Sequence, residues 1–257
     1  LKHIVDNYNN LASKTLFVQA FPYDGYLFIP MDRYFSKTNS SCNNILLSVG
    51  VSNRLLSFYS INKKQFNPVF KNCFLDSGAF SVINSNKKID INKYIDFIKE
   101  NIGKIDVYVT LDVIGDYIKT YNNTVYMEEM GLSPLPVFHY NSPHDHLKYL
   151  VKKYDYLALG GLVPLATRKT VLIEWLDSCF EIIKDKTKIH AFGIFSKDIL
   201  KKYPFYSADS STWITSLKYG NFTLEERYKI TLSRVQQFVE LEKHITDYWS
   251  KKNIQVI

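Results

Sequence analysis

The sequence has few cysteines and lacks the short motifs that mark the commonest cofactor and hydrolase sites. Its three cysteines (Cys42, Cys73 and Cys179) are far apart and form no Cys-X-X-Cys pair, which argues against a structural zinc site and for a reducing compartment. A Walker loop, a Gly-X-Gly-X-X-Gly turn and a Gly-X-Ser-X-Gly elbow are also missing. We therefore expect neither a bound metal nor a cofactor.

Long apolar runs are absent too, and the first residues do not resemble a signal peptide. These absences predict a cytoplasmic protein with no membrane partner. The 32 Lys and Arg residues outnumber the 25 Asp and Glu residues, giving a net charge of +7. An excess of this sign favours an anionic partner, nucleic acid above all.

From Cys73 onward, short apolar segments alternate with amphipathic helical patterns. The expected strands are 73–76, 105–112, 135–139, 156–160, 188–193 and 205–209. The expected helices are 91–102, 117–130, one beginning near Ser142, 167–184, one capped by Ser196, and 223–248. Strands and helices in alternation with short connections predict parallel strands joined by crossover helices.

The first part of the chain is less regular. Segments 16–20 and 45–49 are candidate strands, and 55–61 is a candidate short helix. One or two strands from residues 16–50 bring the total to about eight. The fold class expected is therefore α/β, a (β/α)8 barrel with an irregular N-terminal part, and an open doubly wound sheet is the alternative. No linker divides the chain, so residues 1–257 are expected to form one domain.

Polar, aromatic and glycine residues recur where the expected strands end. They are Asp76, Asp112, His139, Gly160, Gly161, Phe192 and Asp209. Each also has a structural explanation, as a helix cap, a core histidine or a turn. Because functional groups of parallel α/β folds gather at the carboxyl ends of strands, their joint occurrence favours one site. Carboxylates, aromatic rings and backbone amides suit a flat heterocycle, and a carboxylate can attack a sugar carbon.

The segments Asp76–Phe80, Leu159–Leu162 and Phe192–Gly193, together with Asp209, resemble the tRNA-guanine transglycosylases. Those enzymes are (β/α)8 barrels that exchange a guanine for a 7-deazaguanine. Segments 111–116, 134–140 and 203–213 are more similar to the DNA branch, the phage-type DNA-guanine transglycosylases of 7-deazaguanine DNA modification. The resemblance covers about residues 70–215 of the chain.

The resemblance implies roles for individual residues. Asp209 matches the nucleophile, and Asp76 matches the general acid and base. The implied substrate-binding residues are Ser77, Gly78, Phe80, Asp112, His139, Gly160, Gly161 and Phe192. Of these, Asp112 matches the reader of the heterocycle edge, Phe80 and Phe192 match the stacking positions, and His139 stands where the tRNA enzymes carry a glutamine.

The chain departs from the tRNA enzymes because it lacks their zinc-binding cysteine cluster and is much shorter, which favours DNA over tRNA. The resemblance thus implies a glycosyltransferase, a pentosyltransferase that exchanges guanine in DNA for a base such as 7-cyano-7-deazaguanine. The expected partners are guanine-containing DNA and the free 7-deazaguanine base, in the host-cell cytoplasm if a phage encodes the protein, and a homodimer is left open.

Three alternatives to this reading of the chain stay open. The first is the same exchange on tRNA, and the second is a nucleic-acid-binding barrel without catalysis. The third is an unrelated barrel lyase or isomerase that acts on a small metabolite.

Overall fold

The computed structural model describes residues 16–21, 47, 49–51, 53–59, 61, 66, 71–82, 88–184, 186–210, 212 and 223–252. For residues 16–21, 224, 225, 227 and 228 it describes the backbone alone. The short apolar run at residues 26–29 and Cys42 both lie outside this part of the chain.

The described residues form an α/β fold with one parallel sheet of eight strands. The strands are β1 (Leu16–Phe21), β2 (Asn53–Ser57), β3 (Asn72–Asp76), β4 (Val107–Tyr108), β5 (Val137–His139), β6 (Tyr156–Gly160), β7 (Lys188–Ala191) and β8 (Ser207–Asp209). Their order is β4-β3-β2-β1-β8-β7-β6-β5. A parallel bridge between Val109 and Leu135 also joins the chain after β4 to the chain before β5.

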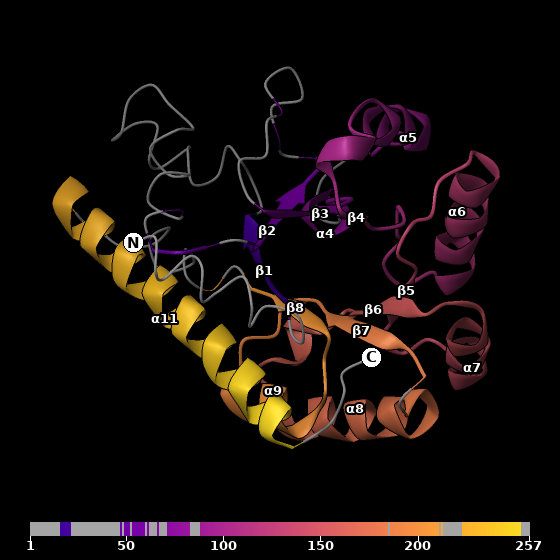
Figure 1. Ribbon diagram of the computed structural model, residues 1–257. Helices are drawn as coiled ribbons and strands as arrows, with labels where there is room; N and C mark the ends of the chain where they lie inside the picture. Colours follow the sequence, from indigo (N-terminus) through magenta and orange to yellow (C-terminus); the bar gives the residue numbers. More distant parts are fainter. Residues whose placement is uncertain are drawn as a thin grey trace.

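Helices follow most strands and surround the sheet (Figure 1). They are α4 (Ala79–Val82), α5 (Ile91–Glu100), η2 (Ile102–Lys104), α6 (Tyr117–Glu129), α7 (His144–Lys153), η3 (Val163–Leu165), α8 (Lys169–Ile183), α9 (Lys197–Lys202) and α11 (Leu224–Lys251). Asp90 caps α5 by accepting hydrogen bonds from the amides of Asn92 and Lys93. Asp116 caps α6 in the same manner, through the amide of Lys119.

The predicted helix 55–61 is wrong, because residues 53–57 form the buried strand β2. Residues 45–49 were a candidate strand, but Leu47 is helical and Val49 lies in a turn. The strand β2 carries only two leucines between polar residues, so its sequence has no strand-like apolar run. Its buried position comes from pairing with β1 and β3.

The apolar core consists of three clusters. The first lies between β2, β3, α5 and α11, and the second between β5–β8, α7, α8, α9 and α11. The third is smaller and contains Leu55 of β2, Phe74 of β3, Val137 of β5 and Ala158 of β6. Side chains from strands on separate parts of the sheet therefore meet in this third cluster.

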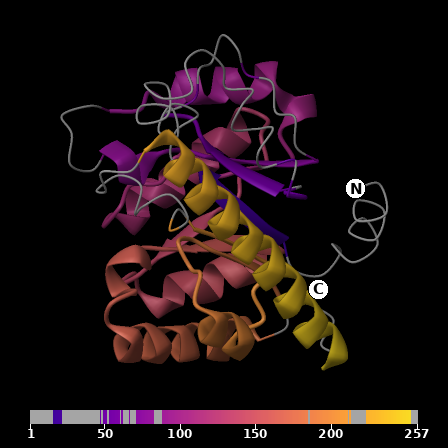
Figure 2. The same cartoon turned by 90° about the vertical axis from the view of Figure 1, so that its left-hand side faces the viewer.

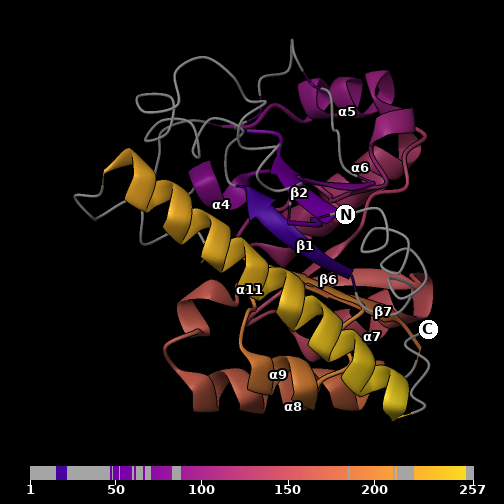
Figure 3. The same cartoon turned by 60° about the vertical axis from the view of Figure 1, so that its left-hand side comes forward.

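The helix α11 begins with a capping box, in which Thr223 and Glu226 satisfy each other's backbone amides, as its sequence predicted. It crosses the molecule diagonally (Figures 2 and 3). Val235 and Phe238 enter the first core cluster, whereas Ile245 and Trp249 enter the second. Although α11 has 28 residues, neither it nor another helix in the described ranges is long and apolar enough to cross a membrane.

Candidate active site

One pocket of about 180 Å³ lies at the carboxyl ends of the strands. The predicted site residues that line it are Asp76, Phe80, Asp112, His139, Gly160, Gly161, Phe192 and Asp209. The parallel strands thus bring together side chains that lie up to 133 positions apart in sequence (76 to 209). The remaining two predicted residues, Ser77 and Gly78, do not line the pocket. They form hydrogen bonds to two residues that do, Asp112 and Asp76.

The turn after β3 fixes Asp76. The Gly78 amide donates to Oδ2 of Asp76 at 2.9 Å, and the Ala79 amide donates to Oγ of Ser77 at 3.1 Å. Gly78 has φ +85°, and a Cβ there would lie 2.5 Å from both Ser57 Oγ and Tyr59 Cβ. Only glycine fits this turn, because both the positive φ and the close approach exclude a side chain.

Asp76 is half-buried behind this turn, and its carboxyl group lies near two others. Removal from water, together with the negative charges of Asp112 and Asp209, raises the pKa of Asp76 to about 8. The hydrogen bond from Gly78 acts in the opposite direction and is outweighed. At neutral pH Asp76 therefore carries a proton that it can donate.

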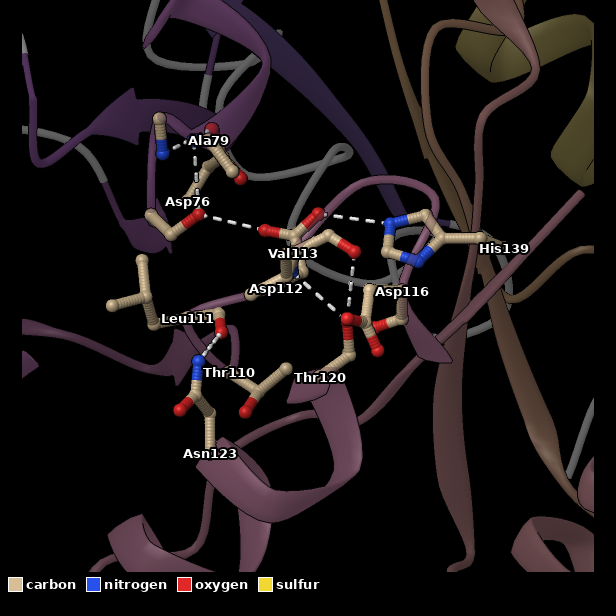
Figure 4. Close-up of polar contacts among 12 residues, drawn as sticks. Asp76, Ala79, Thr110, Leu111, Asp112, Val113, Asp116, Thr120, Asn123 and His139 are labelled. Carbon is tan, nitrogen blue, oxygen red and sulfur yellow. Dashed lines mark hydrogen bonds and ion pairs between the residues drawn. The ribbon is translucent and has the colours of Figure 1, made fainter. Parts of the chain in front are cut away.

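Asp112 is fixed from two sides (Figure 4). The Ser77 hydroxyl donates to Oδ1 at 2.8 Å, and His139 Nε2 lies 2.9 Å from Oδ2. The alternative of a helix cap does not apply, because Asp116 caps α6. Asp112 instead has both oxygens held by side chains from two other strand ends.

His139 is the last residue of β5 and is 4% exposed. Its Nδ1 atom is buried without a hydrogen-bond partner among the described groups. A Cβ at Gly160 would lie 2.7 Å from the His139 ring carbon Cδ2 and 3.0 Å from Val137 Cγ1. Glycine at position 160 therefore leaves room for the ring that contacts Asp112.

Asp209 ends β8 and is 7% exposed. The Gly193 amide donates to its Oδ1 atom at 3.0 Å, and His190 Nε2 lies 3.4 Å from the same oxygen. The longer contact does not count as a hydrogen bond, because Nε2 has no such partner in the described part. The carboxylate is thus oriented through one oxygen.

The two predicted stacking residues line the pocket from different elements. Phe80 lies in α4 and is 57% exposed, and Phe192 follows β7 with its ring edge against His190. An apolar ring that stays this exposed at a pocket rim is available to a ligand.

Several lining residues escaped prediction. Leu55 and Ser57 belong to β2, which the sequence pattern did not reveal, and Ser57 Oγ is buried without a partner in the described part. Ile114, Val163 and Pro164 complete the apolar rim. If residues 53–57 had been predicted as a strand, Ser57 would have been predicted at its carboxyl end, next to the other site residues.

A second hollow of about 370 Å³ lies near the amino ends of β4–β6. Its lining includes Glu128 and Tyr154, whose hydroxyl donates to that carboxylate at 2.8 Å. None of the predicted site residues lines this second hollow.

The described residues contain no group of three or more His, Cys, Asp or Glu side chains placed to hold a metal ion. His144 contacts Ser178, and His146 packs among aromatic rings, so these neighbours in sequence do not form a shared site. Cys73 and Cys179 are both buried.

No protein-family model and no curated protein matches the chain. Among solved structures, it is similar to one described as "Structural study of Project ID from Aquifex aeolicus VF5". The TM-score is 0.52 with 11% sequence identity, and the match covers 92% of this chain and 96% of the other. At this identity the likeness supports a shared fold and carries nothing about activity.

Proposed function

We propose that this protein exchanges guanine in DNA for a 7-deazaguanine base, such as 7-cyano-7-deazaguanine, and is a base-exchange glycosyltransferase. One observation carries the proposal: a single pocket holds three carboxyl groups in different environments beside two phenylalanine rings. Asp76 has a pKa of about 8, whereas Asp209 receives an amide hydrogen bond and Asp112 is bonded on both oxygens. Carboxyl groups held in such different environments are what an acid and a nucleophile require.

In the first half of the reaction, Asp209 attacks the anomeric carbon of the deoxyribose. A bond forms between a carboxylate oxygen and that carbon, the bond from carbon to guanine breaks, and its electron pair goes to the base. Asp76 gives its proton to the departing guanine, which leaves neutral. The DNA is then held as an ester of Asp209.

In the second half, the free 7-deazaguanine occupies the place of guanine. Asp76, now a carboxylate, takes the proton from the attacking nitrogen, and the new bond to the sugar displaces Asp209. Two inversions keep the original configuration of the sugar. The proton returns to Asp76 and the carboxylate to Asp209, so the cycle consumes neither water nor a cofactor.

The remaining lining residues suit a planar base. A cavity of about 150 Å³ holds a benzene ring, so a pocket of about 180 Å³ takes one heterocycle rather than a whole nucleotide. Phe80 and Phe192 offer rings for stacking, and Asp112, with His139 behind it, offers acceptors for the amino and imino groups of the base. A base in a duplex reaches such a pocket only after it is flipped out.

A closed (β/α)8 barrel is the fold that we propose for this chemistry. Strand β1 pairs with both β2 and β8, and the Val109–Leu135 bridge lies between the outermost strands β4 and β5. Phe74 of β3 also stacks on His190 of β7 at 4.4 Å, although these strands are four places apart in the sheet. An open doubly wound sheet has its strand order reversed at a switch point and keeps its edges apart.

DNA is proposed as the polymer, with tRNA as the competing substrate. The net charge of +7 suits either phosphate backbone. The preference for DNA rests on the segments 111–116, 134–140 and 203–213, which resemble the DNA branch.

A base-exchange assay tests the proposal. The protein is incubated with duplex DNA, or separately with tRNA, carrying labelled guanine, together with 7-cyano-7-deazaguanine. We expect label to leave DNA only. Asp209→Asn keeps an acceptor for the Gly193 amide but removes the nucleophile, so we expect release to fall at least about 1,000-fold.

Asp96→Asn is the matched control, because Asp96 is exposed on α5. It should exchange base at the wild-type rate, and both variants should unfold near the wild-type temperature. Release from tRNA alone would keep the chemistry and overturn the polymer. Binding of DNA without release of guanine, and without an adduct that survives denaturation, would favour a barrel that binds and does not react.

A further inference from the structure

A line of buried polar side chains leads from Asp209 away from the pocket. His190 Nε2 lies 3.4 Å from Asp209 Oδ1, His190 Nδ1 lies 2.6 Å from Ser207 Oγ, and Ser207 Oγ lies 2.5 Å from the Tyr156 hydroxyl. Both His190 and Ser207 are 0% exposed. None of the steps in the proposed exchange uses these three side chains.

The His190 ring is fixed by packing. Phe74 stacks on it at 4.4 Å with an interplanar angle of 28°, and Phe192 meets it edge to face at 4.6 Å. The sheet register also places His190 of β7 directly beside Ser207 of β8. This packing therefore keeps the Nε2 side of the ring next to Asp209.

One order of hydrogen bonds along this line places the His190 proton next to Asp209. Either hydroxyl of the Tyr156–Ser207 pair can donate, and the roles of the two His190 nitrogens depend on its tautomer. When Tyr156 donates to Ser207 and Ser207 donates to His190 Nδ1, the ring proton is on Nε2, the nitrogen that lies 3.4 Å from Asp209 Oδ1. The opposite tautomer would instead place the lone pair of Nε2 on the side of this carboxylate oxygen.

The two oxygens of Asp209 differ as a result. Oδ1 accepts from the Gly193 amide at 3.0 Å and faces His190 Nε2. No group in the described part of the chain forms a hydrogen bond to Oδ2. Catalytic contacts that are long without substrate commonly tighten when it binds, so the 3.4 Å separation leaves room for this to happen.

We propose that His190 is a positioning residue that holds Oδ1 of Asp209 and leaves Oδ2 as the attacking atom, with Ser207 and Tyr156 fixing the ring proton on Nε2. This inference rests on the proposed base exchange. Oδ2 forms the bond to the sugar carbon, the electron pair of the broken bond goes to guanine with the proton of Asp76, and Oδ1 becomes the ester carbonyl. The Nε2 proton stays on His190 throughout.

Two substitutions at His190 test the assignment as a matched pair. The amide nitrogen of His190→Gln falls near the position of Nε2 and can still donate to Asp209, whereas that of His190→Asn falls near Nδ1 and reaches only Ser207. Both variants lose the same ring packing against Phe74 and Phe192. They should therefore unfold at similar temperatures.

We expect the single-turnover rate of guanine release to fall about 10- to 100-fold in His190→Asn, the loss of one hydrogen bond to a charged group. In His190→Gln it should stay within about threefold of wild type, and the affinity for the free base should be unchanged in both. Equal rates in the two variants would overturn the positioning role.

The ring proton is measured without any assay of activity. Long-range nitrogen-15 NMR of the intact protein, assigned with His190→Gln, reports which ring nitrogen of His190 is protonated. A proton on Nε2 supports the inference, and loss of that preference in Ser207→Ala supports the chain of donors. A proton on Nδ1, alone or with Nε2, overturns it. Absence of base exchange by the wild-type protein, with the proton on Nε2, counts instead against the proposed function.

Discussion

Asp76 keeps, at neutral pH, a proton that exposed aspartates have lost. Its pKa of about 8 arises from burial and from the charges of Asp112 and Asp209. Because the proposed exchange requires the free protein to hold this proton before guanine leaves, we expect kcat/KM for DNA to fall about tenfold per pH unit above about pH 8. The rate measured between about pH 6 and pH 10 checks this, and a profile that stays level past about pH 9 would contradict the assignment.

The same carboxyl group should make the fold less stable as pH rises. Between the ordinary pKa of 3.8 and about 8, the folded chain holds a proton that the unfolded chain has released. The free energy of unfolding therefore falls as pH increases through this window. Asp76→Asn cannot release a proton, so the stability that this variant loses between about pH 5 and pH 8 should be smaller than the loss of wild type by about 4 kcal/mol.

Denaturant unfolding of wild type and Asp76→Asn at the two pH values gives this difference. The Asp96→Asn variant serves again as the control, because Asp96 is exposed on α5. Identical pH dependence in wild type and Asp76→Asn would mean that Asp76 titrates as an ordinary carboxylate.

At the scale of elements, the end of β6 supports the neighbouring end of β5. The absent side chain of Gly160 leaves space for His139, whose ring holds Asp112. In Gly160→Ala the new methyl group pushes this ring from its place, so we expect KM for the free base to rise about tenfold. Steady-state exchange with varied 7-cyano-7-deazaguanine measures the effect.

Gly103→Ala is the matched control, because a Cβ at Gly103 meets nothing within 4 Å. It should leave KM for the free base unchanged. A normal KM in Gly160→Ala would show that the His139 contact with Asp112 is not needed to hold the base.

The sequence predicted most strands and helices after residue 72, because their apolar patterns are local. Strand β6 (Tyr156–Gly160) and helix α8 (Lys169–Ile183) are examples. Strand β2 was missed for a physical reason. Its buried Asn53 is bonded to Glu242, 189 positions away, so what stabilises the strand cannot be seen in its own residues.

The candidate site, like the fold, could be predicted in part from the sequence. Asp76, Asp112 and Asp209 follow from the rule that parallel strands end at one edge. The position of His190 relative to Asp209 did not follow, because it depends on the register between β7 and β8 and on the Phe74 ring from across the sheet. Neither is encoded in a local pattern.

At the scale of the whole molecule, α11 joins the two large core clusters. Val235 packs in one and Ile245 in the other, and both are buried. We expect Val235→Ala and Ile245→Ala each to lower the free energy of unfolding by about 1–4 kcal/mol. Ten residues of helix separate them by about 15 Å, so their effects should add in the double variant.

Urea unfolding of the two single variants and the double variant measures these energies. Each should show one transition at the same denaturant dependence as wild type. Two separate transitions in either single variant would mean that the clusters unfold independently and that α11 does not couple them.

The pairing of β1 with β8 has a consequence for the newly made chain. Leu16 and Ser207 are partners across these strands, so the first and last strands in the sequence pair only after the chain has been synthesised past residue 207. Closing so long a loop is a slow step of folding. Under the proposed base exchange, a nascent chain that already carries Asp76 and Asp112 would therefore have no Asp209 in place, and an unfinished protein would not release bases from DNA and leave damaged sites behind.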